Sequence, residues 1–236
     1  MSHSFGRYER RGIVRRLLKK AELVRRYVFF LVGLFVNSLG IALITRANLG
    51  TSPISSNPYV LSIGFTPSLG MFTLYFSLLL IVLQLIVLGK RFPKPYWLQV
   101  PVSVVFSAFI DLSMSLFFWV NPQAYALKLA ALLIGCVVLG FGVYMEVAAN
   151  VVMLPGECTV NAISMRWHTD FGKTKVGMDV TMAVCAALLS FILFHHLEGV
   201  REGTFISALL VGFLARFFGK LADRPIQKLL RGHAAA

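Results

Sequence analysis

The chain has 236 residues, of which 57% are hydrophobic and only 14% charged, and its mean hydropathy is +0.75. A soluble domain of this size would lack the polar residues needed to cover its surface, so the composition excludes an ordinary soluble protein and indicates an integral membrane protein. The net charge of +13 raises the question of a nucleic-acid partner, which the distribution of the basic residues answers.

Six apolar runs follow one another along the chain, each close to the length that a helix needs to cross a membrane. About 20 residues of α-helix span the roughly 30 Å of hydrocarbon. The runs lie at 27–45, 70–89, 97–119, 127–147, 177–194 and 204–219. We therefore predict an all-α, multi-pass membrane protein with six transmembrane helices. The first run is expected to stay in the mature chain, because no small-residue cleavage site follows it.

The basic residues alternate between the connections of these spans. Nine lysines and arginines precede Tyr27, three follow the second span, three follow the fourth, and five lie from Arg216 onwards. Three others remain for the opposite side: Arg46, Lys128 and Arg201. Positive charge on alternate connections predicts that both termini are cytoplasmic and that the protein lies in the inner membrane. It also makes a nucleic-acid partner unnecessary.

Residues 1–26 form a basic segment ahead of the first span. Its apolar residues fall on one helical face and its basic residues on the other, and the apolar ones are Ile13, Val14, Leu17, Leu18, Ala21 and Val24. Such a helix would lie on a leaflet that contains anionic lipid. A solvated leader that only sets the topology is the alternative. A second basic segment, the tail at 222–236, ends the chain.

The two halves of the membrane region, 27–119 and 127–221, resemble each other. An offset of 102 positions aligns Leu31 with Leu133, Gly33 with Gly135, Val36 with Val138, Gly40 with Gly142, Ala47-Asn48 with Ala149-Asn150, and Pro53 with Pro155; later in the halves an offset of 107 aligns Gly70-Met71 with Gly177-Met178. Each half holds three spans, so the second half would enter the membrane from the opposite side. This is an inverted repeat, an architecture of many secondary transporters. Chance similarity between apolar segments is the competing explanation.

Each half also contains a break followed by a short helix. The first break reads "RANLGTSPISSN" and the second reads "AANVVMLPGECT". Proline at the first helical position predicts helix starts near Pro53 and Pro155, and before Pro53 the hydroxyl of Ser52 is expected to cap free amides. Non-helical backbone is tolerated at membrane depth where protein buries it or where it lines a cavity. We therefore expect two re-entrant half-helices whose N-termini face one midplane site for a solute.

The candidate solute-binding residues come from these breaks: Asn48, Ser52, Ser55, Asn150, Gly156 and Glu157. Glu157 lies in the first turn of the second half-helix, where the helix dipole favours a carboxylate, whereas Ser55 holds the aligned position. This inequality suits an asymmetric or zwitterionic solute. Two alternatives remain open: Glu157 could only cap its helix near water or Lys175, and the two asparagines could only bridge helices.

Four carboxylates are candidates for carrying a coupling proton: Glu157, Asp111, Glu146 and Asp179. Asp111 is the deepest in its apolar run, so it is expected to be paired, protonated or in a wet cavity. Glu146 precedes Asn150 by four residues and shares its helical face. Three further polar residues, Asn37, Ser38 and Gln84, are interpreted as interhelical hydrogen-bonding residues.

Four segments resemble the repeated signatures of the YczE/YyaS/YitT-like family of bacterial integral membrane proteins: "GIALITRANLGTSP", "LPGECTVNAIS", "KTKVGMDV" and "GVREGTFISALLVG". The resemblance covers about Tyr27 to Leu221 and implies a six-helix inner-membrane protein. Members of that family often carry Gly-x-x-Pro followed by Trp-Asp or Arg-Asp at the breaks. Here an acidic residue follows only the second break, which argues against a symmetric carboxylate pair.

These observations predict a secondary transporter of a small polar or charged solute, driven by protons or, through unwound carbonyls beside the asparagines, by sodium. Two other classes remain open: a solute-binding subunit that needs an energising partner complex, and a membrane scaffold or regulator that acts through its basic N-terminus. We find no phosphate-binding glycine loop, zinc-ligand spacing or nucleophile elbow, so we expect no enzyme, cofactor or metal. A monomer and a homodimer are both open.

Overall fold

The computed structural model describes the backbone of residues 2–231 and the side chains of residues 20–230, and no strand occurs within this part. Its α-helices are α1 (Ser2–Arg46), α2 (Pro53–Gly64), α3 (Leu69–Leu88), α4 (Gln99–Leu116), α5 (Tyr125–Ala149), α6 (Pro155–Trp167), α7 (Phe171–Phe194) and α8 (Glu202–Arg231). Two short 3-10 helices, η1 (Gly89–Arg91) and η2 (Lys94–Leu98), join α3 to α4. Six helices in the described part are long and apolar enough to cross a membrane, which confirms the predicted number of spans.

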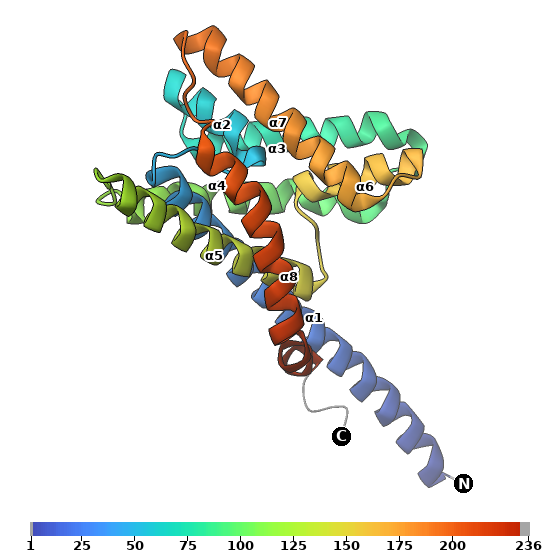
Figure 1. Ribbon diagram of the computed structural model, residues 1–236. Helices are drawn as coiled ribbons and strands as arrows, with labels where there is room; N and C mark the ends of the chain where they lie inside the picture. The colour runs from blue at the N-terminus through green and yellow to red at the C-terminus, as the bar shows by residue number, and fades with distance from the viewer. Residues whose placement is uncertain (1, 232–236) are drawn as a thin grey trace.

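Helix α1 runs without a break from Ser2 to Arg46, so its backbone joins the basic segment directly to the first span. Its first turns project away from the rest of the molecule (Figure 1). The amphipathic face expected between Ile13 and Val24 lies largely outside the described side chains. At the other end of the chain, α8 continues past the expected boundary at residue 221 to Arg231, although Pro225 lies inside it. A proline inside a helix bends it without necessarily ending it.

Helices α1 and α5 cross closely because a glycine of each faces the backbone of the other. A Cβ atom added at Gly40 would lie 2.5 Å from the amide nitrogen of Leu139, and one added at Gly142 would lie 2.5 Å from that of Asn37. Leu139 follows Asn37 by 102 residues, as Gly142 follows Gly40. The two contacts are therefore reciprocal in the alignment of the halves.

A second pair of glycines on these helices repeats this arrangement. A Cβ added at Gly33 would lie 2.9 Å from Cβ of Met145, and one added at Gly135 would lie 3.2 Å from Cβ of Leu43. Met145 again follows Leu43 by 102 residues. Along α1 the contacts advance from Gly33 to Gly40 while along α5 they retreat from Met145 to Leu139, so the two helices are antiparallel.

Buried polar side chains tie the helices together. The hydrogen bonds join Asn37 of α1 to Glu146 of α5 (2.7 Å), Ser38 of α1 to Ser113 of α4 (2.8 Å), and Gln84 of α3 to Gln99 of α4 (3.1 Å). The interhelical role predicted for Asn37, Ser38 and Gln84 is confirmed by these contacts. The apolar core around them is formed by α1, α4 and α5, with Phe30, Ile44 and Leu132 fully buried.

The short helices α2 and α6 begin at Pro53 and Pro155, as the breaks predict. Helix α2 packs on α3 and α7, and α6 packs on α3 and α7 (Figure 1). The paired asparagines Asn48 and Asn150 end the preceding helices with φ angles of 54° and 51°. Asparagine tolerates this left-handed conformation better than most residues, so the repeated asparagines have a structural role as helix terminators.

The capping prediction for Ser52 is wrong in its detail. Ser52 occupies the N-cap position of α2, but its hydroxyl makes no bond to an amide of the helix. It donates instead to Oγ of Ser55, 3.0 Å away, because the amide of Ser55 is already bonded to the carbonyl of Ser52 at 2.9 Å.

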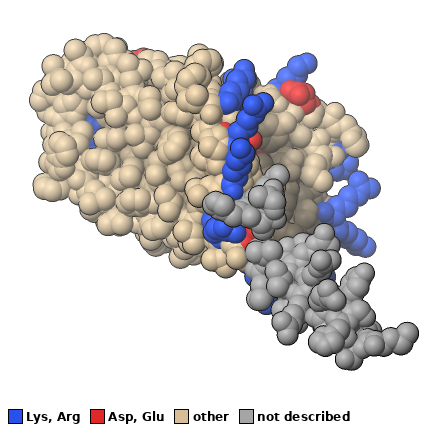
Figure 2. Space-filling model, turned by 90° about the horizontal axis from the view of Figure 1, so that it is seen from below, with Lys and Arg blue, Asp and Glu red and all other residues tan. Residues whose placement is uncertain are grey.

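Lysine and arginine side chains gather at one end of the molecule, and the remaining visible surface is almost free of charge (Figure 2). Arg26 of α1 lies at this end, where it donates to the carbonyl of Ala149 at the end of α5 (3.1 Å). Gln227 of α8 donates to the neighbouring carbonyl of Ala148 (3.0 Å). These two bonds attach the middle of α1 and the last turns of α8 to the end of α5.

The close crossing of α1 and α5 predicts that Gly142→Ala destabilises the protein, because the new methyl group would overlap the backbone of Asn37. Overpacking of this kind costs about 1–3 kcal/mol. Gly212→Ala on α8 is the matched control, because nothing lies within 4 Å of a Cβ added there. Thermal unfolding of the purified variants in detergent should show a lower melting temperature for Gly142→Ala alone, and equal melting temperatures would contradict the crossing.

Candidate functional site

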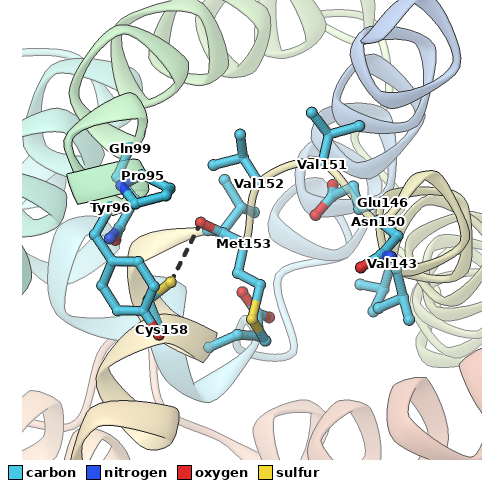
Figure 3. A pocket seen from close by; sticks show the side chains of 13 residues that line it. Pro95, Tyr96, Gln99, Val143, Glu146, Asn150, Val151, Val152, Met153 and Cys158 are labelled. Atoms are coloured by element: carbon cyan, nitrogen blue, oxygen red, sulfur yellow. Dashed lines mark hydrogen bonds between the residues drawn. The ribbon is translucent and has the colours of Figure 1, made fainter. Parts of the chain in front are cut away.

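A cavity of about 320 Å³ lies beside the second break. Its walls are the end of α5, the link 151–154, the start of α6 and the segment from Pro95 to Gln99. The polar residues that line it are Tyr96, Gln99, Glu146, Asn150 and Glu157. In Figure 3, Pro95, Tyr96 and Gln99 lie on one side, and Glu146, Asn150 and Val151 lie across the opening from them.

The second break creates this cavity. The left-handed Asn150 ends α5, and α6 starts at Pro155, so the backbone between them is not helical. Met153 of this link is 41% exposed. Glu157 then falls in the first turn of α6, where the positive end of the helix dipole favours a negative side chain.

Two carboxylates approach the cavity from different helices. Glu146 is 7% exposed and accepts a hydrogen bond of 2.7 Å from Nδ2 of Asn37. Glu157 is half-buried and lies close enough to Glu146 for their charges to interact. With no basic side chain among the lining residues, the cavity can accept a proton, a cation or a hydrogen-bond donor.

Helix α7 adds a charged pair behind Glu157. Lys175 Nζ lies 2.7 Å from Oδ1 of Asp179, and both charges act on the carboxylate of Glu157. Glu157 therefore has the location that each interpretation requires, because it lines a cavity and lies within electrostatic reach of Lys175, and its role stays a prediction. Asp179 lies eight residues inside α7, because this helix begins at Phe171 and not at the start of the apolar run.

The wall opposite Asn150 is held by buried hydrogen bonds. The amides of Gln84 and Gln99 bond to each other in both directions, at 3.1 and 3.0 Å. Gln84 also donates to the carbonyl of Pro155 and to Thr159, both at 3.1 Å, and thereby attaches α3 to the start of α6. The hydroxyl of Tyr96 accepts a hydrogen bond of 2.9 Å from Asn161.

The first break is closed where the second is open. The carbonyl of Leu49 accepts a hydrogen bond of 2.8 Å from the amide of Gly203, and the amide of Thr51 donates to the carbonyl of Gly199 at 3.3 Å. Leu49 is 1% exposed and Thr51 is fully buried. A Cβ at Gly203 would lie 2.6 Å from the carbonyl oxygen of Leu49, so the start of α8 lies directly on the link.

Asn48 and Asp111 line a different cavity, of about 950 Å³, together with Arg46 and Tyr59. Asp111 accepts hydrogen bonds from the amide of Gly70 (2.8 Å) and the hydroxyl of Ser68 (2.7 Å), and so caps the start of α3. It lies five residues before the end of α4 at Leu116, and not in the middle of the span where the apolar run places it. This bonding gives Asp111 a capping role, and its role as a proton carrier stays a prediction.

The start of α2 does not join either cavity. Ser52 and Ser55 bond to each other, and a side chain added at Gly156 would overlap Ile54 of α2. The two half-helices therefore meet through packed atoms at their first turns. Of the predicted site residues, the structure brings Glu146, Asn150 and Glu157 together and keeps Asn48, Ser52, Ser55 and Asp111 apart from them.

Sequence reasoning missed the wall formed by Tyr96 and Gln99. A glutamine at the start of an apolar run is a detectable signal, because an amide is costly in a membrane unless it is bonded or faces water. Tyr96 gives no such signal, since it follows Lys94-Pro95 in a connection where aromatic residues are common.

The fold and composition define a multi-pass, all-helical membrane protein. Residues 24–220 match the family of unknown function DUF6198, and the chain belongs to this family. It is 25% identical over 213 residues to the "Uncharacterized protein YyaS" of Bacillus subtilis (strain 168), a similarity that covers 88% of this chain and 100% of that protein. No solved structure matches the chain.

The contrast between the two breaks predicts a difference in thiol accessibility at aligned positions. In a background with Cys136, Cys158 and Cys185 replaced by alanine, Met153→Cys should react quickly with N-ethylmaleimide, because this side chain is exposed. Thr51→Cys, 102 positions earlier, should react slowly because the α7–α8 connection buries it. The measurement is the modified fraction against time by mass spectrometry. Equal rates in the folded protein would contradict the closed first break.

Proposed function

We propose that the protein is a secondary transporter of a small polar or charged solute, built from two inverted repeats of three spans and one half-helix each. The reciprocal contacts between α1 and α5 support the repeat, because each contact has a partner displaced by 102 residues in both helices. Antiparallel helices related in this way have their two-fold axis in the membrane plane, which is the geometry of inverted repeats.

The orientation is supported by charge. Twenty of the 23 basic residues lie in the two terminal segments and in the connections that follow the second and fourth spans. In Figure 2, the lysine and arginine side chains that the structure describes gather at one end of the molecule. The positive-inside rule assigns this end to the cytoplasm. In this orientation the 320 Å³ cavity opens toward the cytoplasm, and the 950 Å³ cavity opens toward the outside.

The observation that carries the proposal is that equivalent contacts are made in one repeat and absent in the other. Leu49 of the closed first break bonds to Gly203. The aligned residues of the other repeat are Val151, by the offset of 102, and Tyr96, by the offset of 107. Both line the cytoplasmic cavity, and Figure 3 shows them on opposite sides of it.

This inequality is what a carrier requires. One state exposes the site to the cytoplasm while the start of α8 closes the outer side. Exchanging the two arrangements would bring Val151 and Tyr96 together and separate Leu49 from Gly203, which would open the outer side. Because the repeats are similar, the two states can differ little in free energy, and a bound solute can shift their balance only through unequal affinity for them.

Proton coupling would use the two carboxylates of the cytoplasmic cavity. Glu146 and Glu157 lie within electrostatic reach of each other, so a proton or a cationic group between them relieves their repulsion. Binding of one ligand then changes the affinity for the other by the same factor. Glu157 is the candidate coupling residue, since Glu146 is already bonded to Asn37.

The test is Glu157→Gln in proteoliposomes, with a solute chosen by a thermal-shift screen of the purified protein against a metabolite library. Glutamine keeps the shape and the hydrogen bonds but removes the titrating proton. We expect wild type to accumulate the solute when only a pH difference is applied, and Glu157→Gln to lose accumulation while it still exchanges solute.

Asp111→Asn is the matched control, because Asp111 caps α3 away from the cytoplasmic cavity, and this variant should retain accumulation. Accumulation by Glu157→Gln equal to that of wild type would leave Glu157 as a structural residue. Wild-type protein that binds the solute tightly in liposomes but never moves it would favour the binding-subunit function instead.

A further inference from the structure

A third cavity, of about 450 Å³, lies between the end of α3 and the end of α6. Lys90 and Arg91 of η1 and Arg166 in the last turn of α6 line it, and no acidic residue is among its lining residues. Among the described side chains, none forms an ion pair with these three cations. Three like charges around one cavity repel each other, and an anion bound between them would offset this repulsion.

The other part of the cavity wall is apolar. Ile86 and Val87 of α3 and Met165 of α6 line it, and Ile86 is 74% exposed and Met165 52% exposed. Ile86 and Val87 belong to a helix that is long and apolar enough to span the membrane. A ligand that satisfies the whole cavity therefore has a negative headgroup and an apolar portion.

Aromatic residues place this cavity at the depth of lipid headgroups. Trp167 follows Arg166 directly, is 59% exposed, and has its ring centroid 6.0 Å from the guanidinium carbon of Arg166. Trp97 in η2 is 54% exposed at the same connection as Lys90. Exposed tryptophans mark the boundary between hydrocarbon and water.

We propose that this cavity binds the phosphate-bearing headgroup of an anionic phospholipid, with the acyl chains along Ile86, Val87 and Met165. Basic pockets between transmembrane helices bind such headgroups. The site is separate from the basic N-terminus. Bound lipid would join α3 to α6, the same two helices that Gln84 joins at the start of α6. The inference does not depend on transport, so it can fail or hold independently of the proposed function.

The test measures the melting temperature of delipidated protein in detergent after addition of phosphatidylglycerol, phosphatidylcholine or inorganic phosphate. We expect phosphatidylglycerol to raise the melting temperature and the other two to leave it nearly unchanged. The triple variant Lys90→Gln/Arg91→Gln/Arg166→Gln should lose most of that rise, and native mass spectrometry should show less retained phosphatidylglycerol.

The matched control is Lys173→Gln/Lys220→Gln/Arg224→Gln, which removes the same charge from exposed positions outside the cavity. It should respond to phosphatidylglycerol as wild type does. Equal loss in both triple variants would overturn the site in favour of diffuse electrostatic attraction. A rise with inorganic phosphate as large as that with phosphatidylglycerol would overturn the assignment to a lipid and leave a phosphate site.

Discussion

Where a helix breaks inside a folded protein, the backbone groups that the break releases need new hydrogen-bond partners, because a buried and unpaired backbone group is costly. The two breaks of this protein meet that constraint differently. Leu49 and Thr51 of the first break bond to the backbone of the α7–α8 connection, which closes the link. The carbonyls around the second break are satisfied by side chains of Arg26, Gln227 and Gln84, which leave one face of the link open to a cavity.

Under the proposed function, the arrangement of the helices would turn this local difference into two states. Glycines allow α1 and α5 to cross closely in antiparallel directions. The contacts at this crossing are reciprocal in the alignment of the two halves. Helices α2 and α6 meet where Ile54 packs on Gly156. In the proposed carrier, this crossing would stay fixed while the connections at each end close one side and open the other. Glu146 and Glu157 lie on the open side, where a solute or proton entering from that side would reach them.

Much of the fold follows from local sequence signals. The apolar runs predict six spans, and proline at the first helical position predicts the starts of α2 and α6. The repeat of Asn48 at Asn150 is visible in the sequence, but the left-handed backbone of both residues is not. An asparagine that binds a ligand, bridges two helices or ends a helix looks the same in a single sequence. Glu146 and Asn150 do line the same cavity, but Asn150 is left-handed and lies just outside α5, so the spacing of four residues in a helix is not what brings them together.

The rest of the site depends on contacts between distant segments, which a single sequence does not encode locally. The capping role of Asp111 could not be predicted, because its bonds to Ser68 and Gly70 arise only when α4 packs beside the start of α3. Tyr96 and Gln99 became cavity residues through the approach of α4 to the second break. The unequal closure of the two breaks is likewise a property of tertiary packing.

The measurement that tests the account most directly is a pair of distances between spin labels in lipid nanodiscs, by double electron–electron resonance. One pair is Asn48 with Arg201 at the closed break, and the other is Asn150 with Lys94, the aligned positions at the open break. All four residues are exposed, and both asparagines are left-handed, so the labels perturb the two breaks alike. The account predicts two populations that change in opposite directions when pH or solute changes, the first distance lengthening as the second shortens. Distances that stay fixed, or that lengthen together, would contradict it.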